Sequence, residues 1–201
     1  MGSGHETVLR SRGNQHGRAY RYTKGTSLPS AVSGNRVAIA GGSGGQSVAI
    51  TDVFAESGLK VPTLTEASYV ELASFFRVVG ASYRNPIDIG TANRDEIGRI
   101  IGIVERDANV DNLIFIITMH LRTPAQLQGN VDLMINTRKR TTKPVMGIVF
   151  YSNGTEMDNA REVMLKLQEA GIAAFPAMER GARALRNDLQ YYRFKRSSDN
   201  N

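Results

Sequence analysis

Short, uninterrupted apolar runs alternate along this chain with longer segments whose apolar residues recur at helical spacing. The clearest runs are residues 36–40, 112–118 and 143–150, and a helical pattern links Ile97, Ile100, Ile101 and Val104. An apolar run without polar alternation is typical of a strand in a parallel sheet that helices cover on both faces. The alternation therefore predicts an α/β protein of about five β–α units joined by right-handed crossovers.

Such units favour a flavodoxin-like, doubly wound parallel sheet of five strands in the order 2-1-3-4-5, within three α/β/α layers. We expect strands at 36–40, 112–118, 143–150 and 172–176, and a short extended piece at 60–64 as the remaining strand. Helices are expected at 46–57, 65–76, 93–107, 156–170 and 178–194, and a further one begins at Pro124 after Thr123. Proline suits a first helical position because no N–H is needed there.

We expect one ordered domain at 35–196 between two polar ends. Residues 1–34 are rich in Gly, Ser, Arg and Asn and have few periodic apolar positions, which is typical of a flexible tail or an interdomain linker. Residues 197–201 form a second polar tail. There is no apolar core of a signal peptide and no apolar run near the roughly 20 residues that cross a bilayer. We therefore expect a cytoplasmic protein without a membrane partner.

The absence of cysteine excludes a disulfide scaffold, a thiolate nucleophile and a Cys-based zinc or iron–sulfur site. The histidines, His5, His16 and His120, show no metal-ligand spacing. They also form no recognisable nucleophile–His–acid set from their order alone. We therefore expect no metal site in this chain.

The net charge of +6 is concentrated at the two ends of the sequence. Only residues 138–140 form a basic run inside the body, and we interpret that run as a solvated helix end. We expect the aromatic residues Tyr191, Tyr192 and Phe194 to pack the last helix. Aromatic and basic residues also do not interleave in the pattern of a single-strand binding platform. Nucleic acid is therefore not a partner that we expect.

A glycine-dense turn, Gly41 to Gly45, directly follows the first apolar run and precedes an amphipathic segment that starts at Gln46. A strand–turn–helix junction of this kind directs free N–H groups and the positive end of a helix dipole at one point, where anions bind. The chain lacks a Walker-type Gly-Lys-Ser/Thr sequence and the Gly-x-Gly-x-x-Gly pattern of dinucleotide sites. The alternative is a purely structural role, in which these glycines only permit a tight turn and close helix packing.

Other candidate side chains follow the remaining strands, at the edge where open α/β sheets bind ligands. His120 is a candidate acid–base group or phosphoryl acceptor, and the alternative is a hydrogen-bonded loop residue. Asp88 either caps the next helix or orients a neighbouring loop, or it merely stabilises a turn. Asn85 precedes Pro86, whose peptide bond is either cis or trans.

Three sequence segments together resemble a known family. They are GNRVAIAGGSGG at 34–45, ESGLKVP at 56–62 and NPIDIG at 85–90, and the residues around Lys143, Gly171 and Arg183 also fit. The chain resembles, over residues 34–195, the flavodoxin-like ligase-CoA domain of NDP-forming acyl-CoA synthetases. That domain is more distantly related to the C-terminal domain of the succinyl-CoA synthetase β subunit.

The resemblance implies a role at a shared site. Enzymes of this family interconvert acyl-CoA, NDP and phosphate with acid, CoA and NTP through a phosphohistidine carried by a neighbouring domain. The turn would help to hold that phosphoryl group, through Gly41, Gly42, Ser43, Gly44, Gly45 and Gln46, with Asn85 and Asp88 in support. CoA would bind a CoA-binding domain, and ATP or ADP with Mg an ATP-grasp domain, so no cofactor is expected on this chain itself.

The chain lacks a Ser-His-Thr-Gly-like phosphohistidine motif as well as CoA-binding and ATP-grasp sequence. We therefore expect a domain or subunit of an acid–thiol ligase that is not a complete enzyme. The alternative is a non-catalytic relative that serves as a binding or scaffolding module. A flavodoxin or response-regulator analogue is disfavoured, because no acidic cluster ends the first strand and no flavin-loop hydroxyl pattern is present.

Overall fold

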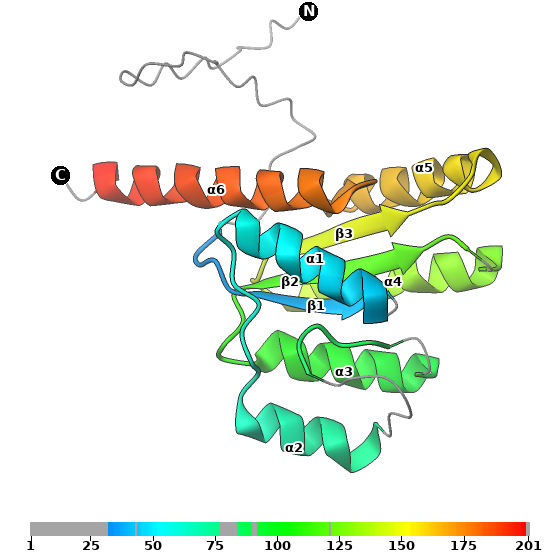
Figure 1. Cartoon of the computed structure of the whole chain (residues 1–201), viewed down its shortest axis with the longest axis horizontal. Helices are drawn as coiled ribbons and strands as arrows, with labels where there is room; N and C mark the ends of the chain where they lie inside the picture. The colour runs from blue at the N-terminus through cyan, green and yellow to red at the C-terminus, as the bar shows by residue number, and fades with distance from the viewer. Residues whose placement is uncertain (1–31, 43, 77–83, 90–91, 121, 200–201) are drawn as a thin grey trace, which may run out of the picture.

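A computed structural model describes residues 32–42, 44–76, 84–89, 92–120 and 122–199. Its centre is a parallel sheet of four strands in the order β1-β2-β3-β4 (Figure 1). The strands are β1 (Val37–Gly41), β2 (Asn112–Thr118), β3 (Val145–Phe150) and β4 (Ala173–Phe175). Ile39 lies opposite Ile114, which in turn lies opposite Met146. The strand residues are almost all buried, as the apolar runs predicted.

Helices cover both faces of the sheet, so the expected three layers are confirmed (Figure 1). α1 (Gly44–Glu56) and α6 (Met178–Asp199) pack on one face, where Phe54 and Leu185 meet Ile39 and Ile148. The other face carries α2 (Glu66–Phe75), α3 (Arg94–Arg106), α4 (Pro124–Arg140) and α5 (Gly154–Glu169). Alternate residues of each strand therefore belong to different cores.

The five-stranded sheet of order 2-1-3-4-5 is not confirmed, because only its four-stranded part is found in the described chain. Beside β1, where the remaining strand was expected, the structure has only isolated bridges from Lys60 to Arg36 and from Ile87 to Ala40. Between these bridges the side chain of Asn85 bonds the backbone of β1, and Pro62 has no N–H to offer a ladder. A side chain thus replaces part of the expected strand pairing.

Helix starts follow the sequence signals closely. Asn93 and Thr123 each cap a helix in a reciprocal capping box, with Glu96 at α3 and Gln126 at α4. Thr65 caps α2 by accepting from the Ser68 N–H. The end of α6 differs from the prediction, because the helix continues to Asp199 and includes residues 197–199, which were expected to form a tail.

A network of paired charges closes the amino edge of the sheet, where the strands begin. The Arg36 guanidinium donates to both carboxylate oxygens of Asp111, at 3.0 and 2.7 Å. Asp107, 3% exposed, accepts from the Thr65 N–H at 2.8 Å, and the Lys143 Nζ donates to the Asp107 backbone oxygen at 2.7 Å. These contacts join the start of β1, the start of α2 and the loops before β2 and β3.

The carboxylates of this network are held in their charged form. Burial by itself raises the pKa of Asp107, but hydrogen bonds from Ser68, Thr65 and Asn109 outweigh it, so the pKa lies below its usual value. Burial likewise opposes ionisation of Asp111, and the hydrogen bonds and charge of Arg36 outweigh it and lower the pKa. Folding therefore stabilises both carboxylates as anions.

Candidate functional site at the carboxyl edge of the sheet

Two of the turn glycines are required by the backbone itself. Gly41 has φ +108°, and a Cβ there would collide with the backbone oxygen of Ile116. Gly42 has φ +76°, and its Cβ would lie 3.1 Å from both the Gln46 Oε1 and the Ile116 Cδ1. Residues with a side chain rarely adopt such φ values. The interpretation that the glycines permit a tight turn and close packing therefore accounts for Gly41 and Gly42.

The next two glycines are not explained by the turn. Gly44 and Gly45 form the first helical positions of α1, are exposed, and have open space where a Cβ would stand. Glycine lowers helix stability by about 0.5–1 kcal/mol relative to alanine in a helix interior, so it is not a stabilising choice here. What the two glycines provide is unobstructed access to the N–H groups of the first turn of α1.

Those N–H groups are suited to an anion. The first N–H groups of a helix have no intrahelical acceptor, and the first turn of α1 contains no acidic side chain. Ser47 lies in the same turn, is 8% exposed, and its buried hydroxyl has no hydrogen-bond partner in the described structure. Ser43, the remaining member of the predicted turn, lies outside the described residues.

The side chain of Asn85 holds the backbone of β1, the strand that leads into this turn. Its side-chain amide donates to Val37 O and Pro62 O, both at 2.9 Å, and its Oδ1 accepts from the Ile39 N–H at 3.0 Å. The Asn85–Pro86 peptide bond is cis, and Ile87 O accepts from the Gly41 N–H at 3.1 Å. Asn85 therefore positions the end of β1, and the polar atoms of its side chain are engaged with the backbone.

Asp88 does not cap the following helix, because Asn93 does so. It is partly buried and follows the bridge at Ile87 directly. The capping interpretation was therefore wrong, and the other two, that Asp88 orients a neighbouring loop or that it stabilises a turn, stay predictions.

His120 lies just beyond β2 at the same edge and is held by a carboxylate. Its Nδ1 is 3.4 Å from Glu156 Oε1, and the other oxygen of Glu156 accepts from the Ser152 N–H at 2.7 Å. The imidazole is 60% exposed. These contacts match the interpretation of His120 as a hydrogen-bonded loop residue.

The other helices that begin at this edge are closed by their own side chains. Thr123 accepts from the Gln126 N–H at α4, and Asn153 accepts from the Glu156 N–H at α5. The first turn of α1 contains two glycines and no acidic side chain, and Ser43, which precedes it, lies outside the described residues. Among the described residues, no cluster of His, Asp and Glu could hold a metal ion.

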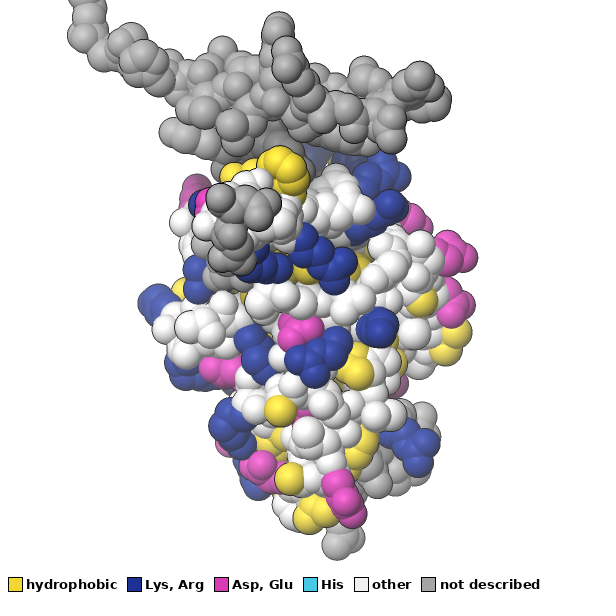
Figure 2. All heavy atoms as spheres, turned by 90° about the vertical axis from the view of Figure 1, so that its left-hand side faces the viewer, with side chains coloured by type: hydrophobic (Ala, Val, Ile, Leu, Met, Phe, Trp, Pro, Cys, Tyr) yellow, Lys and Arg dark blue, Asp and Glu magenta, His cyan; other side chains and the backbone are white. Residues whose placement is uncertain are grey.

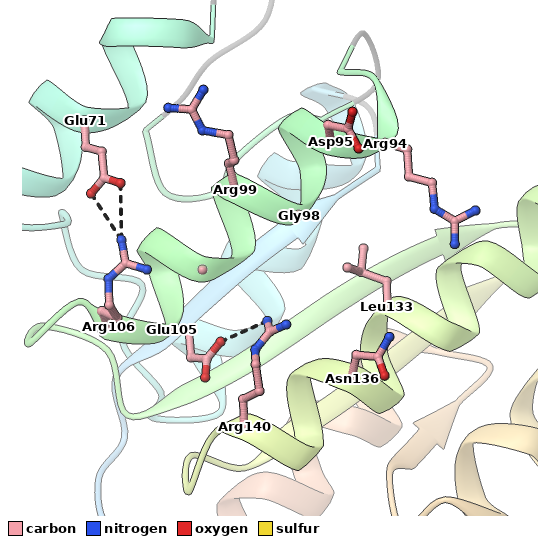
Figure 3. Close-up of a pocket in the computed structure, with 11 residues that line it drawn as sticks. Glu71, Arg94, Asp95, Gly98, Arg99, Glu105, Arg106, Leu133, Asn136 and Arg140 are labelled. Atoms are coloured by element: carbon pink, nitrogen blue, oxygen red, sulfur yellow. Dashed lines mark hydrogen bonds and ion pairs between the residues drawn. The ribbon is translucent and has the colours of Figure 1, made fainter.

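A hollow that the sequence analysis missed lies over the helices α2, α3 and α4 (Figure 3). This cavity of about 650 Å³ has Gly98 and Gly102 of α3 on its wall. Arg106 pairs with Glu71, and Arg140 pairs with Glu105, each at 3.2 Å. The sequence signal was present as two glycines four residues apart among charged residues. None of the predicted turn residues lines this hollow.

The fold and the turn together define a class: a parallel α/β domain in which β1 runs through a glycine turn into an open helix N-terminus. Known proteins resemble the chain more narrowly than this class. No family model matches the chain. The alpha subunit of acetate–CoA ligase [ADP-forming] II from Pyrococcus furiosus is 30% identical over 149 residues, which is 73% of this chain and 31% of that subunit.

Solved structures give the same result. The crystal structure of PH0766 from Pyrococcus horikoshii OT3 matches 82% of this chain and 37% of its own, with 29% identity and a TM-score of 0.69. The dinucleotide-forming acetyl-coenzyme A synthetase 1 of Ca. Korarchaeum cryptofilum matches 85% of this chain and 36% of its own, with 27% identity and a TM-score of 0.67. That synthetase was also solved in complex with phosphate and ADP.

The chain is a homologue of the alpha subunit of ADP-forming acetate–CoA ligase, and its fold is similar to those of PH0766 and of an acetyl-coenzyme A synthetase. It spans about a third of the length of these relatives. Within the described residues, no helix is both long and apolar enough to cross a membrane.

Proposed function

We propose that this chain is a domain or subunit of an NDP-forming acyl-CoA synthetase and that its α1 N-terminus stabilises a phosphoryl group carried by a histidine of another domain. The observation that carries the proposal is the combination of Gly44 and Gly45, which leave the helix start open, with the unpartnered buried hydroxyl of Ser47. The homology to an ADP-forming ligase subunit supplies the chemical context.

The proposed contribution is electrostatic. A phosphoryl group at the start of α1 would receive hydrogen bonds from the N–H groups of Gly44 to Gln46 and would face the positive end of the helix dipole. These donors are fixed before the ligand arrives, so little reorganisation is needed when negative charge develops. A few neutral donors without a fixed cation bind free phosphate only weakly, with a Kd on the order of millimolar.

The rest of the reaction belongs to other parts of the synthetase. In the overall reaction a carboxylic acid, CoA and NTP give acyl-CoA, NDP and phosphate, and a phosphohistidine carries the phosphoryl group between sites. We propose that this carrier is a histidine of another domain and not His120, the described histidine of this chain, which contacts Glu156. We propose that CoA-binding, phosphohistidine and ATP-grasp domains are the partners and that CoA, ATP or ADP, and Mg bind there.

The proposal is tested by titrating inorganic phosphate into the ¹⁵N-labelled full chain and following its amide resonances. We expect shifts at Gly44, Gly45 and Gln46 that saturate in the millimolar range. Gly45→Asp places a carboxylate in the open space at this helix start, so it should abolish the shifts by repulsion. The same carboxylate suits the helix dipole, so the variant should fold.

Gly154→Asp is a matched control. Gly154 is the first residue of α5 and also has open space at its Cβ position, but Asn153 caps that helix. The control should keep the wild-type response to phosphate. Unchanged α1 amides in the wild type, or equal losses in both variants, would contradict the proposed site and favour the alternative of a binding or scaffolding module.

A further inference from the structure

The outer face of α6 carries several cations that make no ion pair in the described structure and an exposed acid, Glu179. Leu185 and Leu189 bury one side of this helix against the sheet. The opposite side is solvent-exposed, and its basic residues have no ion-pair partner among the described residues: Arg180, Arg183, Arg186, Arg193 and Lys195. By contrast, the arginines of the hollow over α3 include Arg106 and Arg140, which are paired with acids.

Two aromatic side chains lie on the same exposed side of α6. Tyr191 is 40% exposed and Phe194 is 66% exposed, so the expectation that these residues pack the helix was wrong for Phe194. Tyr192 turns inward and packs against the core, with its ring centroid 5.3 Å from that of Tyr191. Residues three apart on a helix share a face, so Tyr191 and Phe194 form one exposed aromatic pair beside Lys195.

The length and position of α6 extend this face. Its 22 residues correspond to about 33 Å at the rise of an α-helix. In Figure 1 the helix crosses one side of the molecule and its last turns run beyond the strands. Figure 2 faces the end where α6 terminates and shows Lys and Arg side chains spread over that end. Arg196 also donates to Val32 O at 3.2 Å, which places the start of the described chain against this basic end.

The ordinary role of basic residues near a helix C-terminus is to complement the dipole, but this explains only the last turn. Arg180, Arg183 and Arg186 lie in the first half of α6, where cations gain nothing from the dipole. An anionic membrane surface is also a poorer match, because interfacial helices bury a broad apolar stripe and the exposed face here has only the aromatic pair. Unneutralised cations beside stackable rings instead suit a polymer of phosphates and bases.

We propose that the outer face of α6 binds single-stranded nucleic acid, with Arg180, Arg183 and Arg186 contacting backbone phosphates and Tyr191 and Phe194 stacking on bases. The linear sequence disfavoured this partner because its charges seemed to lie in terminal segments. The structure brings the charges and the exposed rings of one terminal segment together on a continuous helix face. The proposal is independent of the phosphoryl site at α1.

The test is fluorescence anisotropy of labelled (dT)20 and (rU)20 with the full chain at 50–200 mM salt. We expect salt-dependent binding, with a slope of log K against log[salt] near −0.7 for each phosphate contacted. Arg183→Gln/Arg186→Gln should reduce the magnitude of the slope by about 1.4. Tyr191→Ala/Phe194→Ala should weaken binding about 10-fold or more with little change in slope.

Matched controls exist on other elements. Arg138→Gln/Lys139→Gln removes the same charge from the end of α4, and Val48→Ala/Leu165→Ala removes exposed apolar groups from α1 and α5. Both should bind as the wild type does. Circular dichroism at 222 nm checks that every variant retains its helices.

Three outcomes would overturn the proposal. The first is no binding of either oligonucleotide at 50 mM salt. The second is an equal effect of the α4 and α6 charge variants, or wild-type binding by the aromatic variant. The third is co-sedimentation with vesicles of phosphatidylcholine and phosphatidylserine in place of oligonucleotide binding, which would assign the face to a membrane surface.

Discussion

At the amino edge of the sheet, charged side chains pair with each other, whereas at the carboxyl edge α1 begins with two exposed glycines. Asp111 accepts three hydrogen bonds from Arg36, and Asp107 joins the start of α2 to the loop before β2. At the other edge, a Cβ at Gly44 or Gly45 would meet open space, and the buried Ser47 hydroxyl has no hydrogen-bond partner in the described structure. The same strands thus begin in a region whose charged groups are paired and end in one where the first turn of α1 presents N–H groups and no acidic side chain.

The two edges differ in what their polar groups contribute, which is stability at the amino edge and, in our proposal, anion binding at the carboxyl edge. Polar groups that are buried and paired stabilise the fold, and removing one partner is costly. Donors that stay unpaired contribute little to stability and are available to an anion. We therefore expect substitutions at the amino edge to change stability without changing phosphate binding, and substitutions at the open turn of α1 to do the reverse.

The largest effect on stability should come from Gly41→Ala, at the point where β1 enters the turn. Its φ of +108° is unfavourable for alanine, and the new methyl group would collide with Ile116 O. We expect a loss of about 3 kcal/mol or more in the free energy of unfolding. Urea titration followed by circular dichroism measures it.

Gly45→Ala is the control within the same turn. Its Cβ would enter open space, so its stability should equal or slightly exceed that of the wild type. Equal destabilisation by the two variants would show that the described turn geometry is wrong.

Asp111→Ala should lower stability by about 2 kcal/mol, because it leaves Arg36 without its charged partner and the Arg36 N–H without its acceptor. Its phosphate response at α1 should be unchanged. Asp158→Ala removes an exposed pair with Arg161 and should cost less than about 0.5 kcal/mol. A loss of the phosphate-induced amide shifts in Asp111→Ala would contradict the proposal that the amino edge affects stability and not phosphate binding.

The amino edge should also account for part of the acid sensitivity of the protein. Asp107 and Asp111 have folded-state pKa values below the usual value, so each stabilises the fold fully above the unfolded pKa near 3.9. This stability is lost as the pH falls through the folded pKa. The drop in unfolding free energy between pH 6 and pH 3 should therefore be smaller in Asp111→Asn. A drop as large as that of the wild type would contradict the assigned pKa shift.

The smallest effect is expected for His120→Ala. The imidazole is 60% exposed, and Glu156 keeps its bond to the Ser152 N–H without it, so stability should change by less than about 0.5 kcal/mol. Phosphate shifts at Gly44 and Gly45 should persist. Their disappearance would assign His120 to the anion site and would require a new account of this edge.

The sequence predicted the parts of this structure that local chemistry decides. The apolar runs located four strands, and Asn93, Thr65 and Thr123 marked helix starts that the structure confirms. The glycine-rich segment was predicted between β1 and the next helix, but α1 begins two residues earlier than predicted, so Gly44 and Gly45 belong to the helix. The sequence did not show which glycines the backbone requires, because only the three-dimensional contacts distinguish Gly41 from Gly45.

Contacts between distant segments were not predictable from the pattern. The amide of Asn85 bonds β1 from 46 residues away along the chain and interrupts the expected edge strand. His120 meets Glu156 across 36 residues. The exposure of Phe194 depends on how far α6 extends past the sheet, which helical spacing alone does not determine.

The central claim is that the start of α1 recognises a phosphoryl group on an imidazole. The most direct test is an amide-shift titration of the full chain with N-phosphoimidazole, using imidazole and Gly45→Asp as controls. We predict saturable shifts at Gly44, Gly45 and Gln46 with N-phosphoimidazole, none with imidazole, and none in the variant. Shifts confined to residues away from α1, or equal shifts with imidazole alone, would contradict the claim.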